Sequence, residues 1–410
     1  MSRHPELLIP ASSLEVLKTA VIFGADAVYI GGEVFGLRAK AKNFSHEDMK
    51  EGIAFAHEHG VRVHVTVNIL AHNRDLEGVR EYLKELKELG PDALIIADPA
   101  IFEMAKEICP EIERHVSTQA NNTNYGTYQF WWKQGAKRVV SARELSLAEI
   151  KEIRAHIPEE MEIESFIHGA MCISYSGRCL LSNYFTGRDA NQGACTHPCR
   201  WKYAVVEETR PGEYMPVYEN ERGTYIFNSK DLCMIEHIPE LIDAGIDSFK
   251  IEGRMKTALY VATVARTYRK AIDDYLEDPE LYRKNMPWYL DQISNCTYRQ
   301  FTTGFYFGRP DDEAQIYDSN TYVREYTYLG IIGEERDGMY RIEQRNKFSV
   351  GETIELMKPN GDNIEVTVRR IVDEDGKEQE SAPHPKQVLY IDLGAPADRY
   401  DILRRKEEAQ

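Results

Sequence analysis

Short apolar runs alternate with amphipathic segments over the first two thirds of the chain. Eight of these runs are rich in β-type apolar residues and have the length of buried strands. They cover residues 7–9, 27–30, 61–67, 93–97, 115–119, 138–140, 163–167 and 248–251. Apolar residues at helical spacing predict helices that include 12–23, 45–59, 76–89, 124–133, 146–156 and 256–275. Strands that alternate with helices in one chain pair in parallel through right-handed crossovers.

Glycines separate the predicted helices from the strands that follow them. Gly24, Gly60, Gly90, Gly135 and Gly245 each stand after a helical stretch and just before an apolar run. A glycine in this place adopts the left-handed conformation that closes a helix, so the chain can turn into the next strand. Eight such units favour an α/β fold of the (β/α)8 TIM-like barrel type. An open doubly wound sheet is the alternative, but no Gly-x-Gly-x-x-Gly follows the first strand, which removes the main support for a dinucleotide-binding fold.

The pattern changes after residue 277, which we take as the end of the barrel domain. Residues 278–325 are rich in Tyr, Asn and Arg and are interpreted as a connector. From residue 326 to 410 the pattern is of the β type, with runs at 328–332, 339–342, 353–356, 364–371 and 388–391 and turn residues between them. This pattern predicts a small C-terminal all-β barrel domain.

An insertion of unusual length separates the seventh and eighth predicted strands. Residues 172–245 stand where a loop of a few residues would suffice, and such insertions in compact domains are usually functional. The insertion contains five of the seven cysteines: Cys172, Cys179, Cys195, Cys199 and Cys233. The other two, Cys109 and Cys296, lie far outside it and are interpreted as small buried hydrophobic residues.

Clustered cysteines without a secretory leader point to a metal site or to redox chemistry rather than to disulfides. Four thiolates suit either zinc or an iron–sulfur cluster. Structural zinc favours two closely spaced pairs, whereas six residues separate Cys172 from Cys179, so the spacing favours a cluster. Cys195 and Cys199 compete for one place. Two alternatives remain open: five buried thiols, or a catalytic thiol with His168 or His197 as its base.

Composition limits the partners and the location. The formal net charge of −17 disfavours binding of nucleic acid by the whole surface, because phosphate contacts need local Lys and Arg. Arg404-Arg405-Lys406 and Arg369-Arg370 are candidates for a local basic patch, although such runs are more often solvated faces. No apolar run of about 18 residues is present and no signal peptide is evident, so we expect no membrane span and a cytoplasmic location.

The residues around the first two cysteines form a specific motif. The motif reads Glu164-x-Phe166-x-x-Gly169-Ala170-Met171-Cys172-x4-Gly177-x-Cys179-x-Leu181-Ser182. It resembles the signature of peptidase family U32, the collagenase-like group of unassigned catalytic type, and matches that signature at every fixed position. The resemblance extends over the whole chain, including the segment that ends at Cys195, the phrase at 302–306 and the β-rich tail.

The resemblance implies an activity and a cofactor. It is strongest to the branch of the family that makes 5-hydroxyuridine at the wobble position of tRNA, in a route that requires prephenate. The branch is also implied to hold a [4Fe–4S] cluster, which residue by residue falls on Cys172, Cys179, Cys195 and Cys233, with Cys199 as a bystander or alternate ligand. The implied partners are tRNA and either a second family member or a second copy of the chain.

The ends of the predicted strands give an independent place to look, because functional groups of βα barrels lie where strands end and loops begin. The strongest candidates for catalysis there are Arg143, His168, Lys250, Glu252 and Arg254. Other polar or small residues at these ends, or in the loop after the second strand, are Gly31, Gly32, Arg38, Lys40, Asn68, Asp98, Gln119, Asn121 and Asn122. Such a ring suits a dicarboxylate such as prephenate through bidentate Arg contacts. Salt bridges among these residues, and a structural role for His168, are the alternatives.

Three functions are weighed on these observations. The leading hypothesis is an enzyme that hydroxylates wobble uridine, with an extruded base entering the barrel mouth. A peptidase is the second, but the sequence contains neither His-Glu-x-x-His nor Gly-x-Ser-x-Gly, so only the family label supports it. A non-enzymatic scaffold that binds a partner through its β domain is the third.

Overall fold

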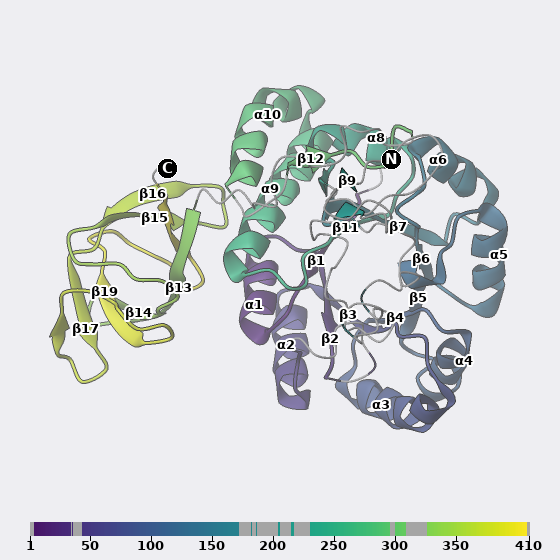
Figure 1. The fold of residues 1–410 in the computed structure, drawn as a ribbon, viewed down its shortest axis with the longest axis horizontal. Coiled ribbons are helices and arrows are strands. Elements are labelled where there is room, and N and C mark those ends of the chain that lie inside the picture. Colours follow the sequence, from purple (N-terminus) through teal and green to yellow (C-terminus); the bar gives the residue numbers. More distant parts are fainter. Residues whose placement is uncertain are drawn as a thin grey trace. The chain divides into compact units, whose positions relative to one another are not determined.

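The computed structural model describes residues 4–33, 35, 43–171, 182, 186, 204–205, 215–216, 230–295, 300–308 and 326–407. Eight parallel strands form a closed barrel, because the last of them pairs with both the seventh and the first (Figure 1). These strands are β1 (Glu6–Pro10), β2 (Ala27–Gly31), β3 (Arg62–Val67), β4 (Ala93–Ile96), β5 (Glu113–Val116), β6 (Arg138–Val140), β7 (Glu162–Gly169) and β11 (Ser248–Ile251). The predicted fold is confirmed.

Helices follow the strands around the outside of the barrel (Figure 1). They are α1 (Leu14–Ile22), α2 (His46–Glu58), α3 (Leu76–Leu89), α4 (Pro99–Ile108), α5 (Tyr125–Gln134), α6 (Leu147–His156) and α8 (Ile238–Asp243). Several begin at a side-chain cap: the Ser146 hydroxyl accepts a hydrogen bond from the Glu149 amide, and the Glu149 carboxylate accepts one from the Ser146 amide. The five glycines predicted to close helices all have a positive φ, as that prediction requires.

One predicted strand is placed wrongly. The sequence pattern predicted a strand over 115–119, whereas β5 ends at Val116 and a 3-10 turn covers Thr118–Ala120. The Ser117 hydroxyl accepts a hydrogen bond from the Gln119 amide at 3.3 Å, which turns the chain out of the strand. The Thr118 hydroxyl donates to the Ser141 carbonyl and fixes that turn against the next strand.

The strand register divides the barrel interior into layers of four side chains, each from alternate strands. Four of these layers, from the amino-terminal end upward, are Glu6, Arg62, Glu113 and Glu162; then Ala27, Ala93, Arg138 and Ser248; then Leu8, His64, His115 and Glu164; then Tyr29, Ile95, Val140 and Lys250. Branched aliphatic side chains usually fill such layers. Here the amino-terminal half of the interior is built largely from ionisable groups.

The long insertion after β7 returns to the barrel through a strand that runs against β7. This strand, β10 (Asp231–Cys233), is antiparallel to β7 and parallel to β12 (Phe301–Thr302). A two-stranded ladder of β8 (Ala204–Val205) and β9 (Met215–Pro216) lies within the insertion. The insertion therefore starts and ends beside the carboxyl end of β7.

The C-terminal part of the chain forms one antiparallel sheet of eight strands in the order β16-β15-β20-β13-β14-β19-β17-β18. Their bounds are β13 (Tyr326–Arg336), β14 (Met339–Glu343), β15 (Thr353–Met357), β16 (Asn363–Thr367), β17 (Arg370–Asp373), β18 (Glu378–Gln379), β19 (Val388–Asp392) and β20 (Ile402–Lys406). Buried side chains such as Leu329, Phe348 and Leu403 form its core. The predicted all-β domain is confirmed.

The prediction of a basic surface patch at residues 404–406 is wrong for Arg404. Arg404 lies in the centre of the sheet on β20, is fully buried, and its Nε donates to Glu355 Oε1 at 2.5 Å. Arg405 forms an ion pair with Glu352 at 2.8 Å. The Arg-rich run is thus part of a strand whose side chains alternate between the two faces of the sheet, and Glu355 and Glu352 pair with Arg404 and Arg405.

Two further helices, α9 (Ala258–Glu277) and α10 (Pro279–Ser294), belong with the C-terminal sheet. Residues 1–17, 25–255 and 299–321 make one compact unit, and residues 18–24, 256–298 and 322–410 make the other. The Arg266 side chain of α9 donates to the Lys358 carbonyl at 2.9 Å, within the second unit. The boundary near residue 255 differs from the predicted end of the barrel domain at 277, and part of the predicted connector is helix α10. None of the helices that the structure describes is long and apolar enough to cross a membrane.

Candidate active site at the carboxyl end of the barrel

Lys250 lies inside the barrel rather than at its rim. Its ammonium is 2.5 Å from Glu164 Oε1 and 4.4 Å from the centre of the Tyr29 ring, and the side chain is almost fully buried. Glu164 is fully buried and also accepts a hydrogen bond from Arg138 at 3.1 Å. Lys250 thus forms one side of a buried ion-pair network beneath the mouth.

Arg254 crosses the mouth toward the loop after β2. It donates to Thr66 Oγ1 at 3.3 Å and to Asn43 Oδ1 at 2.6 Å. The guanidinium lies against the backbone of Gly31, where an added Cβ would stand 2.1 Å from Arg254 Nη2. A side chain at this strand end would therefore push the Arg254 guanidinium out of its present position.

Arg143 and Glu252 face each other at the top of the barrel. Arg143 Nη2 is 3.8 Å from Glu252 Oε2, and the guanidinium carbon is 3.9 Å from the centre of the Phe166 ring. The Tyr29 hydroxyl donates to the Ile251 carbonyl and lies 3.4 Å from Glu252 Oε2. An arginine stacked on an aromatic face keeps its donor edge directed sideways, so its N–H groups can meet a planar carboxylate.

His168 joins the barrel to the cysteine-bearing insertion. Its backbone pairs with Cys233 across β7 and β10, and its carbonyl accepts from the Glu252 amide at 2.8 Å. The ring is buried, with its centre 5.7 Å from that of Phe301. Cys233, partly buried, is thus placed at the carboxyl end of β7, beside the candidate catalytic residues.

Several amides and acids predicted at the mouth have structural partners. Asp98 caps α4 by accepting from the amides of Ala100 and Ile101, and Asn122 Oδ1 accepts from the Trp131 indole at 2.9 Å. Asn68 donates to the Ser117 hydroxyl at 3.4 Å. These contacts hold loops in place. The strongest candidates for catalysis are therefore Arg143, Glu252 and the residues next to them.

Other predicted site residues lie outside the described residues. They are Cys172, Cys179, Cys195, Cys199, Arg38 and Lys40. The cluster ligands, and the choice between Cys195 and Cys199, therefore stay predictions.

Sequence reasoning missed the polar interior below the mouth. Arg138 is 2% exposed and contacts three carboxylates: Glu6 at 2.5 Å, Glu162 at 2.6 Å and Glu164 at 3.1 Å. Burial alone would raise the pKa of the Glu6 carboxyl, but the Arg138 guanidinium outweighs that effect and holds the pKa far below its usual range. The sequence does contain a signal for this interior: in β3 and in the first half of β7, charged, histidine or threonine side chains occupy every second position. Side chains at every second position of a strand point to the same face.

Comparison with known proteins identifies the family. The profile of peptidase family U32 matches residues 12–316, and that of the peptidase family U32 C-terminal domain matches residues 324–404. The chain belongs to peptidase family U32. It is 43% identical to tRNA hydroxylation protein P1 of Bacillus subtilis, over 99% of this chain and 96% of that relative. It is 40% identical to tRNA hydroxylation protein P of Escherichia coli, over 98% and 96% of the two chains. It is 39% identical to the 23S rRNA 5-hydroxycytidine C2501 synthase of Escherichia coli, over 68% of this chain and 40% of that relative.

The structure gives physical reasons for three residues of the U32 motif. Glu164 is the buried carboxylate between Arg138 and Lys250. Phe166 is the ring on which Arg143 stacks. Gly169 has a φ of +104° at the end of β7, so the motif is part of the barrel mouth as well as of the insertion.

We predict that Gly169→Ala destabilises this U32 protein by distorting the barrel mouth. An added Cβ would stand 2.3 Å from the Glu252 carbonyl oxygen, on backbone that L side chains rarely adopt. The variant should therefore displace Glu252 and lose more than about 1 kcal/mol of stability, seen as a lower midpoint of urea unfolding. Gly60→Ala is the control, because Gly60 also has a positive φ but nothing lies within 4 Å of an added Cβ. Equal losses in the two variants would show that contact with Glu252 does not matter.

Proposed function

We propose that this U32 protein hydroxylates a base in RNA, and that its substrate is the wobble uridine of tRNA, converted to 5-hydroxyuridine. The observation that carries the proposal is near full-length similarity to two proteins named for tRNA hydroxylation. A third relative is named for hydroxylation of a cytidine in ribosomal RNA, which places the same change at carbon five of a pyrimidine. The proposed site is the barrel mouth around Arg143, Glu252 and His168.

The proposed chemistry replaces C5–H of the base with C5–OH. When the oxygen comes from water, C5–H and H2O become C5–OH with release of two electrons and two protons, which a two-electron acceptor takes up. An extruded pyrimidine is flat and could stack at the mouth, whose wall includes Phe166 and Phe301. Glu252, placed 3.8 Å from Arg143, is the candidate group to take up a proton there.

The proposed co-substrate is prephenate, a dicarboxylate. The Arg143 guanidinium is stacked on Phe166, and its side chain is one tenth exposed. A carboxylate of the ligand would take the place of the Glu252 carboxylate against this arginine through two parallel hydrogen bonds. Lys250, paired with Glu164, and Arg254, which donates to Asn43, add positive charge near the same opening, and this charge would attract a dicarboxylate.

The proposed cofactor is a [4Fe–4S] cluster held by Cys172, Cys179, Cys195 and Cys233, with Cys199 as the alternate ligand. Of these, Cys233 is described, and it lies at the mouth, partly buried and beside His168. A thiol in that place, at the end of a cysteine-rich insertion, fits a ligand that faces the substrate site. A bound cluster would supply electron transfer or Lewis-acid character.

The cluster proposal predicts a colour that depends on the cysteines. Protein purified without oxygen should be brown and contain about four irons per chain. Cys172→Ala should lose the colour and most of the iron, whereas Cys109→Ala should keep both, because Cys109 is buried at the C-terminal end of α4 and is far from the insertion in sequence. A colourless wild-type protein with stoichiometric zinc would contradict the cluster.

The function itself is tested by nucleoside analysis of tRNA. Digested tRNA from a strain that lacks the gene should contain no 5-hydroxyuridine or its derivatives, while the parent strain contains them. Unchanged 5-hydroxyuridine in the deletion strain would reject the assigned substrate. A peptidase is the weaker alternative, since the sequence holds neither of the two protease motifs sought.

A further inference from the structure

One layer of the barrel interior has an unusual composition. The odd-numbered strands β1, β3, β5 and β7 place Leu8, His64, His115 and Glu164 at the same height, all fully buried. Such a layer is usually four branched aliphatic residues. Here three of its four members are side chains that bind metal ions.

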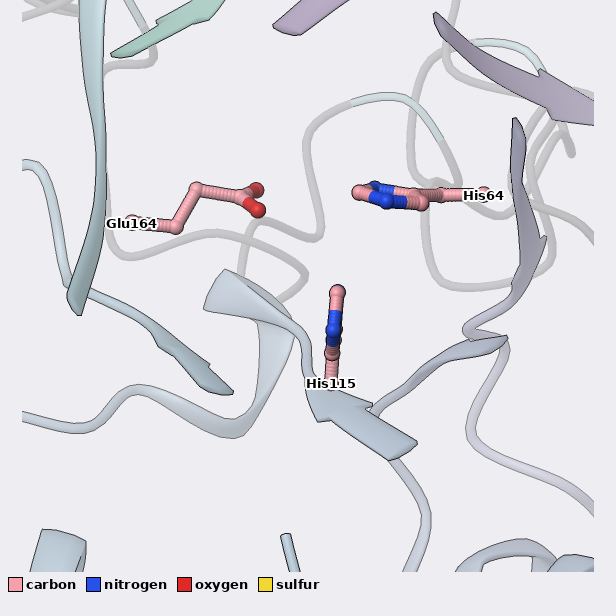
Figure 2. Close-up of side chains that lie close together, drawn as sticks. All are labelled: His64, His115 and Glu164. Carbon is pink, nitrogen blue, oxygen red and sulfur yellow. The ribbon is translucent and has the colours of Figure 1, made fainter. Parts of the chain in front are cut away.

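The three polar side chains point toward one another across the barrel axis (Figure 2). One ligand atom from each residue can be chosen so that all three lie within 4.8 Å of one another. The two imidazole rings are edge to face, with centres 4.8 Å apart and planes at 86°. The side chains come from three separate strands, so the arrangement is set by the barrel and not by a flexible loop.

The two histidines hold buried nitrogen atoms without a partner. Among the described residues, neither ring nitrogen of His64 has a hydrogen-bond partner and Nδ1 of His115 has none, while Nε2 of His115 lies 3.2 Å from Glu113 Oε2. A buried polar atom without a hydrogen bond is destabilising by about 1–3 kcal/mol. A bound ligand would give these ring nitrogens the partners that the described part of the protein does not supply, and leucine or valine would fill the same positions without that cost.

The protonation states favour a cation. Burial lowers the pKa of both His64 and His115 well below the ordinary range, so both rings are neutral near pH 7, the form that binds metals. Glu164 Oε1 accepts from Lys250 and Oε2 accepts from Arg138. Each carboxylate oxygen has two lone pairs, so each retains one for a further bond.

The surrounding charge does not oppose a cation. The inward-facing groups of these layers include four carboxylates, Glu6, Glu113, Glu162 and Glu164, and three cations, Arg62, Arg138 and Lys250. One negative charge is left over. An added cation is therefore attracted by the net charge of the network, although Arg138 and Lys250 themselves repel it.

The geometry points to a buried site for a divalent transition-metal ion, such as Zn²⁺, on His64, His115 and Glu164. Two imidazoles and one carboxylate match the ligand preference of zinc and of neighbouring ions such as Fe²⁺ and Co²⁺, and not that of Ca²⁺ or Mg²⁺. Ligand atoms on one tetrahedral zinc lie about 3.4 Å apart, so atoms that are now up to 4.8 Å apart close by as much as about 1.4 Å on binding. The site ties β3, β5 and β7 together, and it does not depend on the proposed RNA hydroxylation.

The amino-terminal mouth of the barrel lies below this layer. A depression of about 580 Å³ opens there, and its lining includes Glu6, Arg62, Arg138 and Glu162. Six of its lining residues are Asp or Glu and three are Lys or Arg, so the depression attracts cations. Glu6 and Arg138 line the depression and lie one or two layers below the histidines.

Cobalt binding to the full chain tests the site. Protein treated with a chelator is titrated with Co²⁺, and wild type is compared with the double variant His64→Leu/His115→Leu. Wild type should bind one more equivalent of Co²⁺ than the variant, and the difference spectrum should contain d–d bands without thiolate-to-cobalt charge transfer. Zn²⁺ should raise the Tm of wild type by several degrees more than that of the variant.

Exposed histidines provide the matched control. His57→Leu/His59→Leu changes two histidines that lie at the surface and should leave the Co²⁺ stoichiometry unchanged. Equal Co²⁺ binding by wild type and the buried double variant would overturn the site. If the buried variant does not fold, X-ray absorption of zinc-loaded wild type decides: nitrogen and oxygen neighbours with imidazole scattering support the site, and sulfur neighbours alone overturn it.

Discussion

Arg138→Met should lower the free energy of unfolding of the barrel by at least about 3–5 kcal/mol. The methionine has a similar volume but removes a guanidinium that contacts all three of the carboxylates of Glu6, Glu162 and Glu164. Glu164 would keep Lys250 at 2.5 Å, whereas Glu6 and Glu162 would keep the more distant Arg62 at 3.6 Å and Lys137 at 3.3 Å. Removing one member of a buried ion-pair network is strongly destabilising because charges are left uncompensated. The measurement is the midpoint of urea unfolding, followed by far-UV circular dichroism.

The control for this prediction is an arginine outside the network. Arg74→Met alters a side chain that is 79% exposed and pairs only loosely with Asp75, at 3.7 Å. A surface change of this kind stays within about 0.5 kcal/mol. If Arg138→Met shifted the midpoint no more than Arg74→Met, the ion-pair network would not hold the barrel together.

Arg143→Met should reduce RNA hydroxylation by about 100-fold or more while leaving the protein folded. The proposed function gives Arg143 two tasks, binding a substrate carboxylate and facing Glu252 across the mouth. Methionine can still pack on Phe166, so the loss would come from the missing guanidinium rather than from a collapsed site. The rate of hydroxyuridine formation, measured at saturating and limiting prephenate, separates weaker binding from slower chemistry.

A conservative variant sharpens this prediction. Arg143→Lys keeps the charge but loses the planar pair of donors, so it should recover only part of the activity. Full activity of the lysine variant would mean that charge alone matters, and full activity of the methionine variant would remove Arg143 from the site. Arg336→Met serves as the control here, since Arg336 belongs to strand β13 of the C-terminal sheet and is mostly exposed.

The repeating elements of the barrel could be predicted because local signals agree with the fold. Glycines such as Gly90 and Gly135 close helices, and apolar runs mark the strands. The long insertion with its cysteines could also be predicted, from the large number of residues between the seventh and eighth predicted strands. These features depend on residues that are close together in the sequence.

The interior of the barrel could not be predicted because its contacts join distant strands. Arg138 meets Glu6 132 positions earlier in the chain, and Lys250 meets Glu164 86 positions earlier. The 61–67 run looked apolar, yet His64 faces inward, and only the register shows which residues share its layer. Similarly, Arg404 looked like a basic patch until strand β20 placed it opposite Glu355.

Nucleoside mass spectrometry of complemented strains tests the central claim most directly. A bacterial strain that lacks its own U32 relatives would carry an empty vector, the wild-type gene, or the gene for Cys233→Ala or Arg143→Met. The account predicts 5-hydroxyuridine in tRNA with the wild-type gene and little or none with the vector or either variant, at equal levels of folded protein. Hydroxyuridine absent with the wild-type gene, or present at the wild-type level with both variants, would contradict RNA hydroxylation at this barrel mouth.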